Sequence, residues 1–78
     1  MLKLKKNTKV GLSFSSHTSV KAIVKKSNNK KIDCLILDKF FLKSKIIQNL
    51  KIKKYYYTIK NKKDFKKYSN SNLIFENL

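Results

Sequence analysis

The sequence predicts a mainly β fold: a small five-stranded barrel of the oligonucleotide-binding type, with an SH3-like barrel as the alternative and a short helical or irregular connector. Three observations support this prediction. Short apolar runs rich in β-branched residues recur along the chain, polar turns separate them, and two neighbouring runs flank an asparagine pair. At 78 residues, the chain corresponds to one small domain, residues 1–78.

The stretch over residues 20–38 is expected to form a β-hairpin on which the barrel is organised. Its two apolar runs flank Asn28 and Asn29, and asparagine tolerates the left-handed backbone conformation that tight hairpin turns need. Both expected strands carry apolar residues on both faces. Such a ribbon favours a barrel or a covering second layer over a lone exposed hairpin.

Three segments precede the hairpin. Residues 8–15 alternate apolar and polar side chains, which predicts a half-buried strand, and Gly11 within them indicates a bulge or a tight bend. Residues 1–6 alternate leucine with lysine and predict a frayed edge strand or a basic arm. Residues 15–19 are polar and predict a turn.

Four segments follow the hairpin. Residues 39–50 favour a short helix or a turn-rich connector with Asp38 as its N-cap, although an irregular strand also fits the pattern. Residues 51–60 have the composition of a strand, and residues 61–72 are polar and lysine-rich, which predicts a long loop. Residues 72–77 predict a short closing strand.

The charge of the chain is strongly unbalanced. It contains 20 lysines, no arginine and four acidic residues, for a formal net charge of +16. This charge predicts a polyanionic partner, nucleic acid first and an anionic membrane surface second. Lysine is a point charge that suits phosphate groups and reads base edges poorly. The preference for lysine over arginine is also typical of an AT-rich genome, which does not explain the size of the net charge.

Few residues could carry catalytic chemistry. His17 and Cys34 are the single histidine and cysteine, too few for a metal site or a nucleophilic triad, and one glycine cannot form a glycine-rich phosphate loop. We therefore expect no enzyme, no cofactor, no metal and no small-molecule substrate, with an RNA-cleaving toxin based on His17 as an alternative. No apolar run approaches the ~18 residues of a membrane span. Much of the sequence alternates with period two instead of following one helical face, which argues against a membrane-active peptide, so no membrane partner is expected.

The candidate RNA-binding residues fall into three groups. Lysines crowd the tip of the expected hairpin, and others lie in the expected late strand and late loop. Alternation along the late strand places Tyr55 and Tyr57 on one face and Tyr56 on the other, so that one face packs the core and the other can stack on bases. The candidates are Lys25, Lys26, Lys30 and Lys31 at the tip, Lys53, Lys54 and Tyr56 in the strand, and Lys60, Lys62, Lys63, Lys66 and Lys67 in the loop.

Several short stretches carry a family resemblance. The run Val-Gly-Leu-Ser-Phe-Ser over residues 10–15, the turn at 16–19, the run Ala-Ile-Val at 22–24 and the tail from 67 to 78 resemble the small-subunit ribosomal protein family numbered seventeen. The resemblance implies a short, basic, five-stranded barrel that binds ribosomal RNA. Another small ribosomal protein is an alternative.

Together these observations predict a structural constituent of a ribosome, bound to ribosomal RNA through lysine–phosphate contacts and to neighbouring ribosomal proteins. The composition places such a ribosome in the cytoplasm of a reduced AT-rich bacterium or in an organelle. The alternative is a phage or mobile-element protein that binds nucleic acid or an acidic protein partner.

Overall fold

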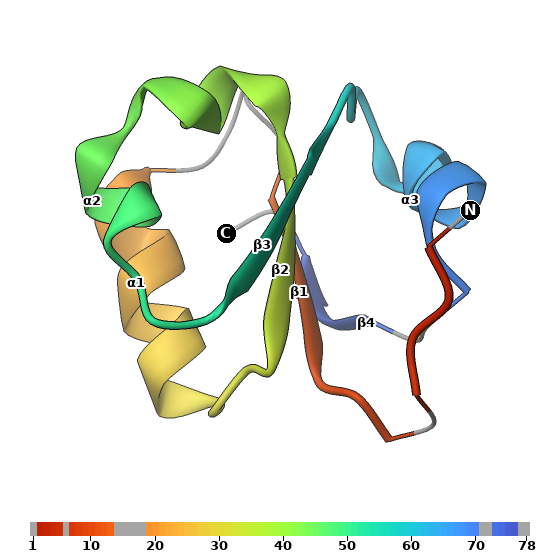
Figure 1. The fold of residues 1–78 in the computed structure, drawn as a ribbon, viewed down its shortest axis with the longest axis horizontal. Helices are drawn as coiled ribbons and strands as arrows, with labels where there is room; N and C mark the ends of the chain where they lie inside the picture. Colours follow the sequence, from red (N-terminus) through yellow and green to blue (C-terminus); the bar gives the residue numbers. More distant parts are fainter. Residues whose placement is uncertain (1, 6, 14–18, 71–72, 77–78) are drawn as a thin grey trace.

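The computed structural model describes residues 2–5, 7–13, 19–70 and 73–76 (Figure 1). Its centre is an open, all-parallel sheet in the order β3-β2-β1-β4. The strands are β1 (Val10–Ser13), β2 (Cys34–Asp38), β3 (Lys53–Tyr57) and β4 (Leu73–Glu76). The predicted five-stranded barrel is therefore wrong, because the sheet ends in two edge strands, β3 and β4, and helices join its strands.

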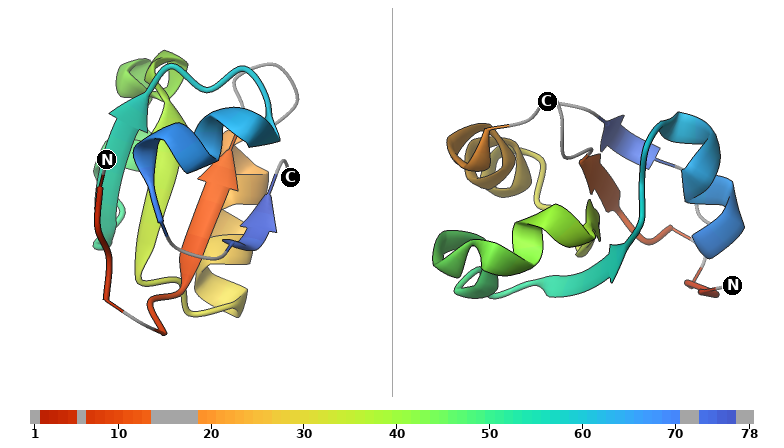
Figure 2. Two further views of the ribbon diagram at one scale, coloured as in Figure 1. Left: turned by 90° about the vertical axis from the view of Figure 1, so that its right-hand side faces the viewer. Right: turned by 90° about the horizontal axis from the view of Figure 1, so that it is seen from above.

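Helical segments cover both faces of the sheet, which makes a three-layer α/β fold. They are α1 (Val20–Asn29), the 3-10 helix η1 (Lys39–Lys43), α2 (Lys45–Gln48) and α3 (Lys62–Tyr68). Helices α1 and α2 lie on one side of the sheet, and α3 lies on the other (Figures 1 and 2). We call these the α1 face and the α3 face.

The predicted hairpin over residues 20–38 is wrong in its first half, which forms α1. The Ser19 hydroxyl accepts a hydrogen bond from the Ala22 amide at 3.1 Å and caps the helix start. Asn28 and Asn29 belong to the last turn of the helix, and the left-handed residue that follows is Lys31, with φ 50°. Parallel strands need a crossover of this kind, since a tight turn can join only antiparallel strands.

Strand β2 is buried on both faces. Cys34 and Ile36 pack toward α3, whereas Leu35 and Leu37 pack toward α1. The core cluster on the α3 face consists of Val10, Leu12, Cys34, Ile36, Ile59 and Phe65. The core cluster on the α1 face consists of Ile23, Ile32, Leu35, Leu37, Phe41 and Ile47. Apolar residues on both faces were predicted correctly, but helices supply the two covers.

Several local predictions are confirmed. Strands occupy the centres of segments 8–15, 51–60 and 72–77, although residues 14–18 lie outside the described part of the chain. The pairing of β1 with β4 shifts register at Gly11, but the extra residue belongs to β4, because Val10 pairs with Leu73 and Gly11 with Phe75. The irregularity predicted at Gly11 thus lies in the strand opposite the glycine. In residues 39–50 the short helical connector is η1 with α2.

The predicted loop over residues 61–72 is wrong, because most of it forms α3. The Asn61 side chain caps this helix by accepting a hydrogen bond from the Lys63 amide at 2.9 Å. Phe65, 4 % exposed, anchors α3 in the core cluster. The N-terminal segment runs beside the end of α3, where the Leu2 amide donates to the Tyr68 carbonyl at 2.7 Å.

Candidate nucleic-acid interface

Most of the lysine side chains that the structure describes lie on the surface without an acidic partner among the described residues. Every lysine whose side chain the structure describes is exposed except Lys54, which is half-buried. Among the described residues a single ion pair forms, between Lys67 Nζ and an Asp64 carboxylate oxygen at 3.3 Å. Because the Lys67 side chain is 69 % exposed, water screens this pair. The surface therefore holds a large uncompensated positive charge.

The described aspartates are too few to balance the lysines, and each of them also binds backbone amides. Each carboxylate accepts at least one amide hydrogen bond of 2.8–2.9 Å: Asp33 from Lys9, Asp38 from Phe40 and Ile59, and Asp64 from Lys60. The amide of Lys60, aided by the nearby Lys67 ammonium, lowers the pKa of Asp64. The few acids thus hold loops and helix starts in place.

The four lysines assigned to a hairpin tip lie on and after α1. Lys25 and Lys26 are exposed on the second half of this helix. Lys30 and Lys31 follow its end, at the edge of the sheet where the strands begin, and Lys53 starts β3 at that same edge. We call Lys30, Lys31 and Lys53 the amino-edge lysines. Lysines therefore gather at this edge of the sheet, where the end of α1 and the start of β3 carry them in place of a hairpin tip.

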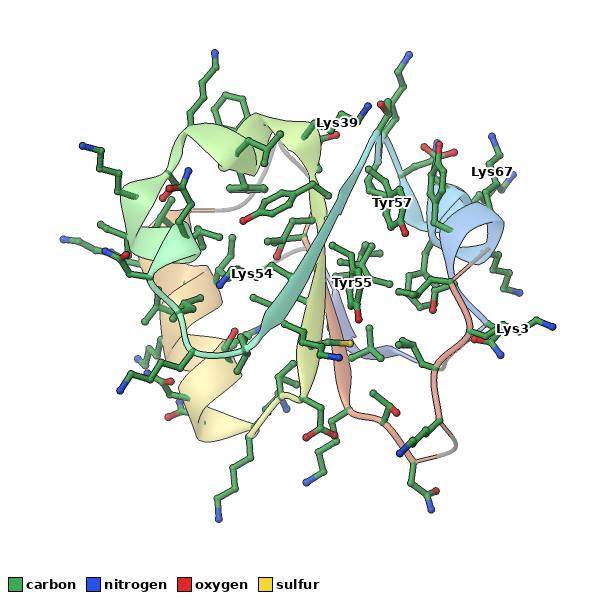
Figure 3. All side chains as sticks on the ribbon, viewed as in Figure 1. Lys3, Lys39, Lys54, Tyr55, Tyr57 and Lys67 are labelled. Atoms are coloured by element: carbon green, nitrogen blue, oxygen red, sulfur yellow. The ribbon has the colours of Figure 1, made fainter. Side chains whose placement is uncertain are left out.

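The late lysines lie on the opposite side of the sheet. Lys63, Lys66 and Lys67 are exposed on α3, and Lys60 precedes the helix. Lys62 begins α3, but its side chain is outside what the structure describes. Figure 3 shows Lys67 and Lys3 on this α3 side, away from α1. The sheet therefore separates the lysines of α1 from those of α3, whereas the predicted Lys53 and Lys54 belong to the edge strand β3 itself.

Lys54 has a structural role that the sequence pattern did not indicate. Its Nζ donates to the Leu50 carbonyl at 2.6 Å and to the Gln48 carbonyl at 3.1 Å. These carbonyls lie at and just after the end of α2, where helical carbonyl groups lack partners in the helix. Figure 3 shows Lys54 extending from β3 toward the α1 face. Lys54 is thus committed to the fold, whereas its neighbour Lys53 is exposed.

The three tyrosines of β3 alternate as predicted. Tyr55 and Tyr57 pack on the α3 face (Figure 3). Tyr56 packs on the α1 face. The Tyr57 ring stacks on Tyr68, with centroids 4.4 Å apart and an interplanar angle of 7°. The Tyr56 hydroxyl is buried, and this burial raises the pKa of Tyr56. All three rings pack against the core, so this arrangement favours packing over base stacking for Tyr56 as well.

Sequence reasoning missed the large apolar side chains that are most exposed. They belong to η1 and α2 and are Phe40 at 55 %, Leu42 at 48 % and Ile46 at 60 % exposure. The available signal was the Phe40-Phe41 pair, which begins two residues after the capping Asp38. Two adjacent residues of a helical turn point in different directions, so only one of the two rings could enter the core.

The remaining candidate residues for chemistry are His17 and Cys34. His17 lies outside the described residues, and within the described ranges no group of three or more metal-ligating acids, histidines or cysteines occurs. Cys34 is a free thiol, 3 % exposed, and its pKa is raised by burial. None of the helices over the described ranges has the length and apolar character needed to cross a membrane.

No protein-family model matches the chain, and no similar protein was found among curated proteins or solved structures. The resemblance to a ribosomal protein family therefore stays a prediction. The barrel that this resemblance implied is replaced by the open parallel sheet.

Proposed function

We propose that this protein binds RNA through contacts between its lysines and backbone phosphates. The observation that carries the proposal is the exposed, uncompensated lysine surface over both sides of the sheet. Binding RNA would release condensed counterions and relieve the self-repulsion of a chain with net charge +16. Because lysine carries a point charge, RNA sequence would be read little.

The distribution of the lysines favours folded or single-stranded RNA over a straight duplex. The molecule measures 27 × 24 × 17 Å. Its exposed lysines include residues of α1, residues of α3 and the amino-edge lysines. Duplex DNA is stiff over about 150 base pairs and could contact one side of such a small body. Folded RNA can surround it. A structural role within ribosomal RNA fits this geometry and is the setting that we propose.

Fluorescence anisotropy with a labelled RNA over a series of salt concentrations tests the proposal. We expect the logarithm of the binding constant to fall linearly with the logarithm of salt, by roughly 0.7 per single-strand phosphate contact. Replacing the amino-edge lysines by glutamine should reduce the slope by about 2, that is, roughly three contacts. Absence of binding at low salt, or equally tight binding of polyglutamate, would favour an acidic protein partner instead. Sedimentation of the native protein with one ribosomal subunit tests the ribosomal setting.

A further inference from the structure

The most distinctive surface feature outside the lysine groups is the ring of Phe40. It is 55 % exposed, whereas the adjacent Phe41 is 1 % exposed and fills the core cluster on the α1 face. Lys39, Phe40 and Lys43 belong to η1, which directly follows β2. They therefore lie at the carboxyl edge of the sheet, where open parallel sheets usually bind ligands.

Phe40 is fixed at its backbone by Asp38, and its ring contacts Phe41. Its backbone amide donates to an Asp38 carboxylate oxygen at 2.8 Å, which fixes the start of η1. Its ring packs edge-to-face with Phe41, with centroids 5.6 Å apart and planes at 86°. A ring ordered before binding loses little conformational entropy when a ligand packs against it. This exposed ring is thus a preorganised surface.

One ammonium group lies close to the ring, and two further exposed lysines lie at the same edge of the sheet. Lys43 Nζ lies 5.9 Å from the centroid of Phe40, and exposed Lys39 precedes it in η1. The second oxygen of Asp38 accepts the Ile59 amide at 2.9 Å, which brings the neighbouring Lys60 to the same edge. Figure 3 shows Lys39 at this edge, close to where the chain leaves β3. We call Lys39, Phe40, Lys43 and Lys60 the carboxyl-edge site.

We propose that the carboxyl-edge site binds single-stranded RNA, with one unpaired base stacked on Phe40 and the adjacent phosphates on the three lysines. This inference rests on the proposed RNA binding and adds a preference for unpaired nucleotides. An aromatic face accepts any base, because every base has a π-face. Asp38 supplies the only carboxylate of the segment from 38 to 61, and two amides already occupy it. The charge around the ring therefore matches a phosphate chain.

The test compares two probes, labelled oligouridine and an abasic ribose-phosphate chain of equal length. The Phe40→Ala variant should bind oligouridine roughly tenfold more weakly, within the range of base–aromatic stacking, and should bind the abasic chain like the wild type. Phe40→Tyr keeps a ring and should retain tight binding. Leu42→Ala removes a neighbouring exposed side chain without a ring and should leave binding of both probes unchanged.

The outcomes distinguish base stacking on Phe40 from the proposed binding of RNA in general. If the wild type binds neither probe, the proposed function itself fails. If it binds both probes and Phe40→Ala changes neither affinity, RNA binding stands and the stacking site is refuted. Equal losses in Phe40→Ala and Leu42→Ala would instead indicate an apolar docking surface for a protein. Thermal unfolding checks the fold. Phe40→Ala loses one edge-to-face contact and should lower the midpoint slightly, whereas Phe41→Ala empties a core position and should lower it strongly.

Discussion

Adjacent lysines on β3 provide a sharp test of the separation between structural and RNA-binding charge. Lys54 donates to the carbonyls of Gln48 and Leu50 beyond the turn before β3, while Lys53 begins the strand and is exposed. Replacing either residue by methionine keeps a long side chain and removes the ammonium. Lys54→Met should then lower the stability and keep RNA binding, whereas Lys53→Met should weaken RNA binding and keep the stability.

The magnitudes follow from the contacts. A hydrogen bond from a charged donor contributes about 1.5–3 kcal/mol when buried, and the half-buried setting of Lys54 reduces the expected loss to about 1–2 kcal/mol for its pair of bonds. In a domain of this size, that loss lowers the thermal midpoint by about 5–15 °C. Lys53→Met should leave the midpoint unchanged and reduce the salt slope of single-stranded RNA binding by about 0.7.

Circular dichroism melts and anisotropy titrations of both variants give the required measurements. The Lys54→Met variant should melt early and keep the wild-type salt slope when assayed well below its midpoint. Equal midpoints in the two variants would refute the capping role of Lys54. Equal reductions in salt slope would show that the ammonium of Lys54 is available to RNA, contrary to its hydrogen bonds.

Two further predictions concern titrating groups. The Lys60 amide, helped by Lys67, lowers the pKa of Asp64 below its ordinary value of 3.8, so the associated stability is present above that value and is lost as pH falls through the lowered pKa. Urea unfolding from about pH 6 to about pH 3 should therefore show a smaller acid destabilisation in Asp64→Asn than in the wild type. Burial, and then the charge of Asp33, raises the pKa of the Cys34 thiol above its ordinary 9.0, so a thiol reagent should label the native protein far more slowly than urea-unfolded protein. Fast native labelling would contradict its burial.

The central error of the sequence prediction lies in residues 20–29. Val20, Ile23 and Val24 favour a strand by propensity, and the same spacing places them on one side of a helix. Packing in the folded protein favours the helix over the strand, because the helix buries Ile23 against a parallel sheet. The decisive local signal was Ser19, whose capping hydroxyl precedes the apolar run.

The continuous apolar run of β2 also had a second interpretation. A strand buried on both faces fits a barrel with a covering layer, and it equally fits the middle of a parallel sheet covered by helices. The sequence from Cys34 to Asp38 alone cannot separate these arrangements, because strand pairing is set by distant segments. The following connector was easier to predict, since Asp38 marks a helix start through a local hydrogen bond.

The candidate site shows the same contrast between local and distant information. Exposed charge on lysines follows from composition, and the alternation of Tyr55 to Tyr57 follows from strand geometry. Which tyrosine face stays exposed depends on the cover supplied by the helices, and here both faces are covered. The role of Lys54 depends on carbonyls across a turn, which a residue pattern does not reveal.

The order of strands in the sheet has a consequence for synthesis. Strand β1 emerges first from the ribosomal tunnel, yet its partner β4 emerges last. A nascent chain that ends after β3 can pack α1 and α2 against one face of the sheet. On the other face, Val10 and Leu12 stay uncovered until α3 has been synthesised. During that interval the chain presents an uncovered apolar face to chaperones and to other nascent chains. Translation of α3 and β4 thus completes both the core cluster on the α3 face and the sheet.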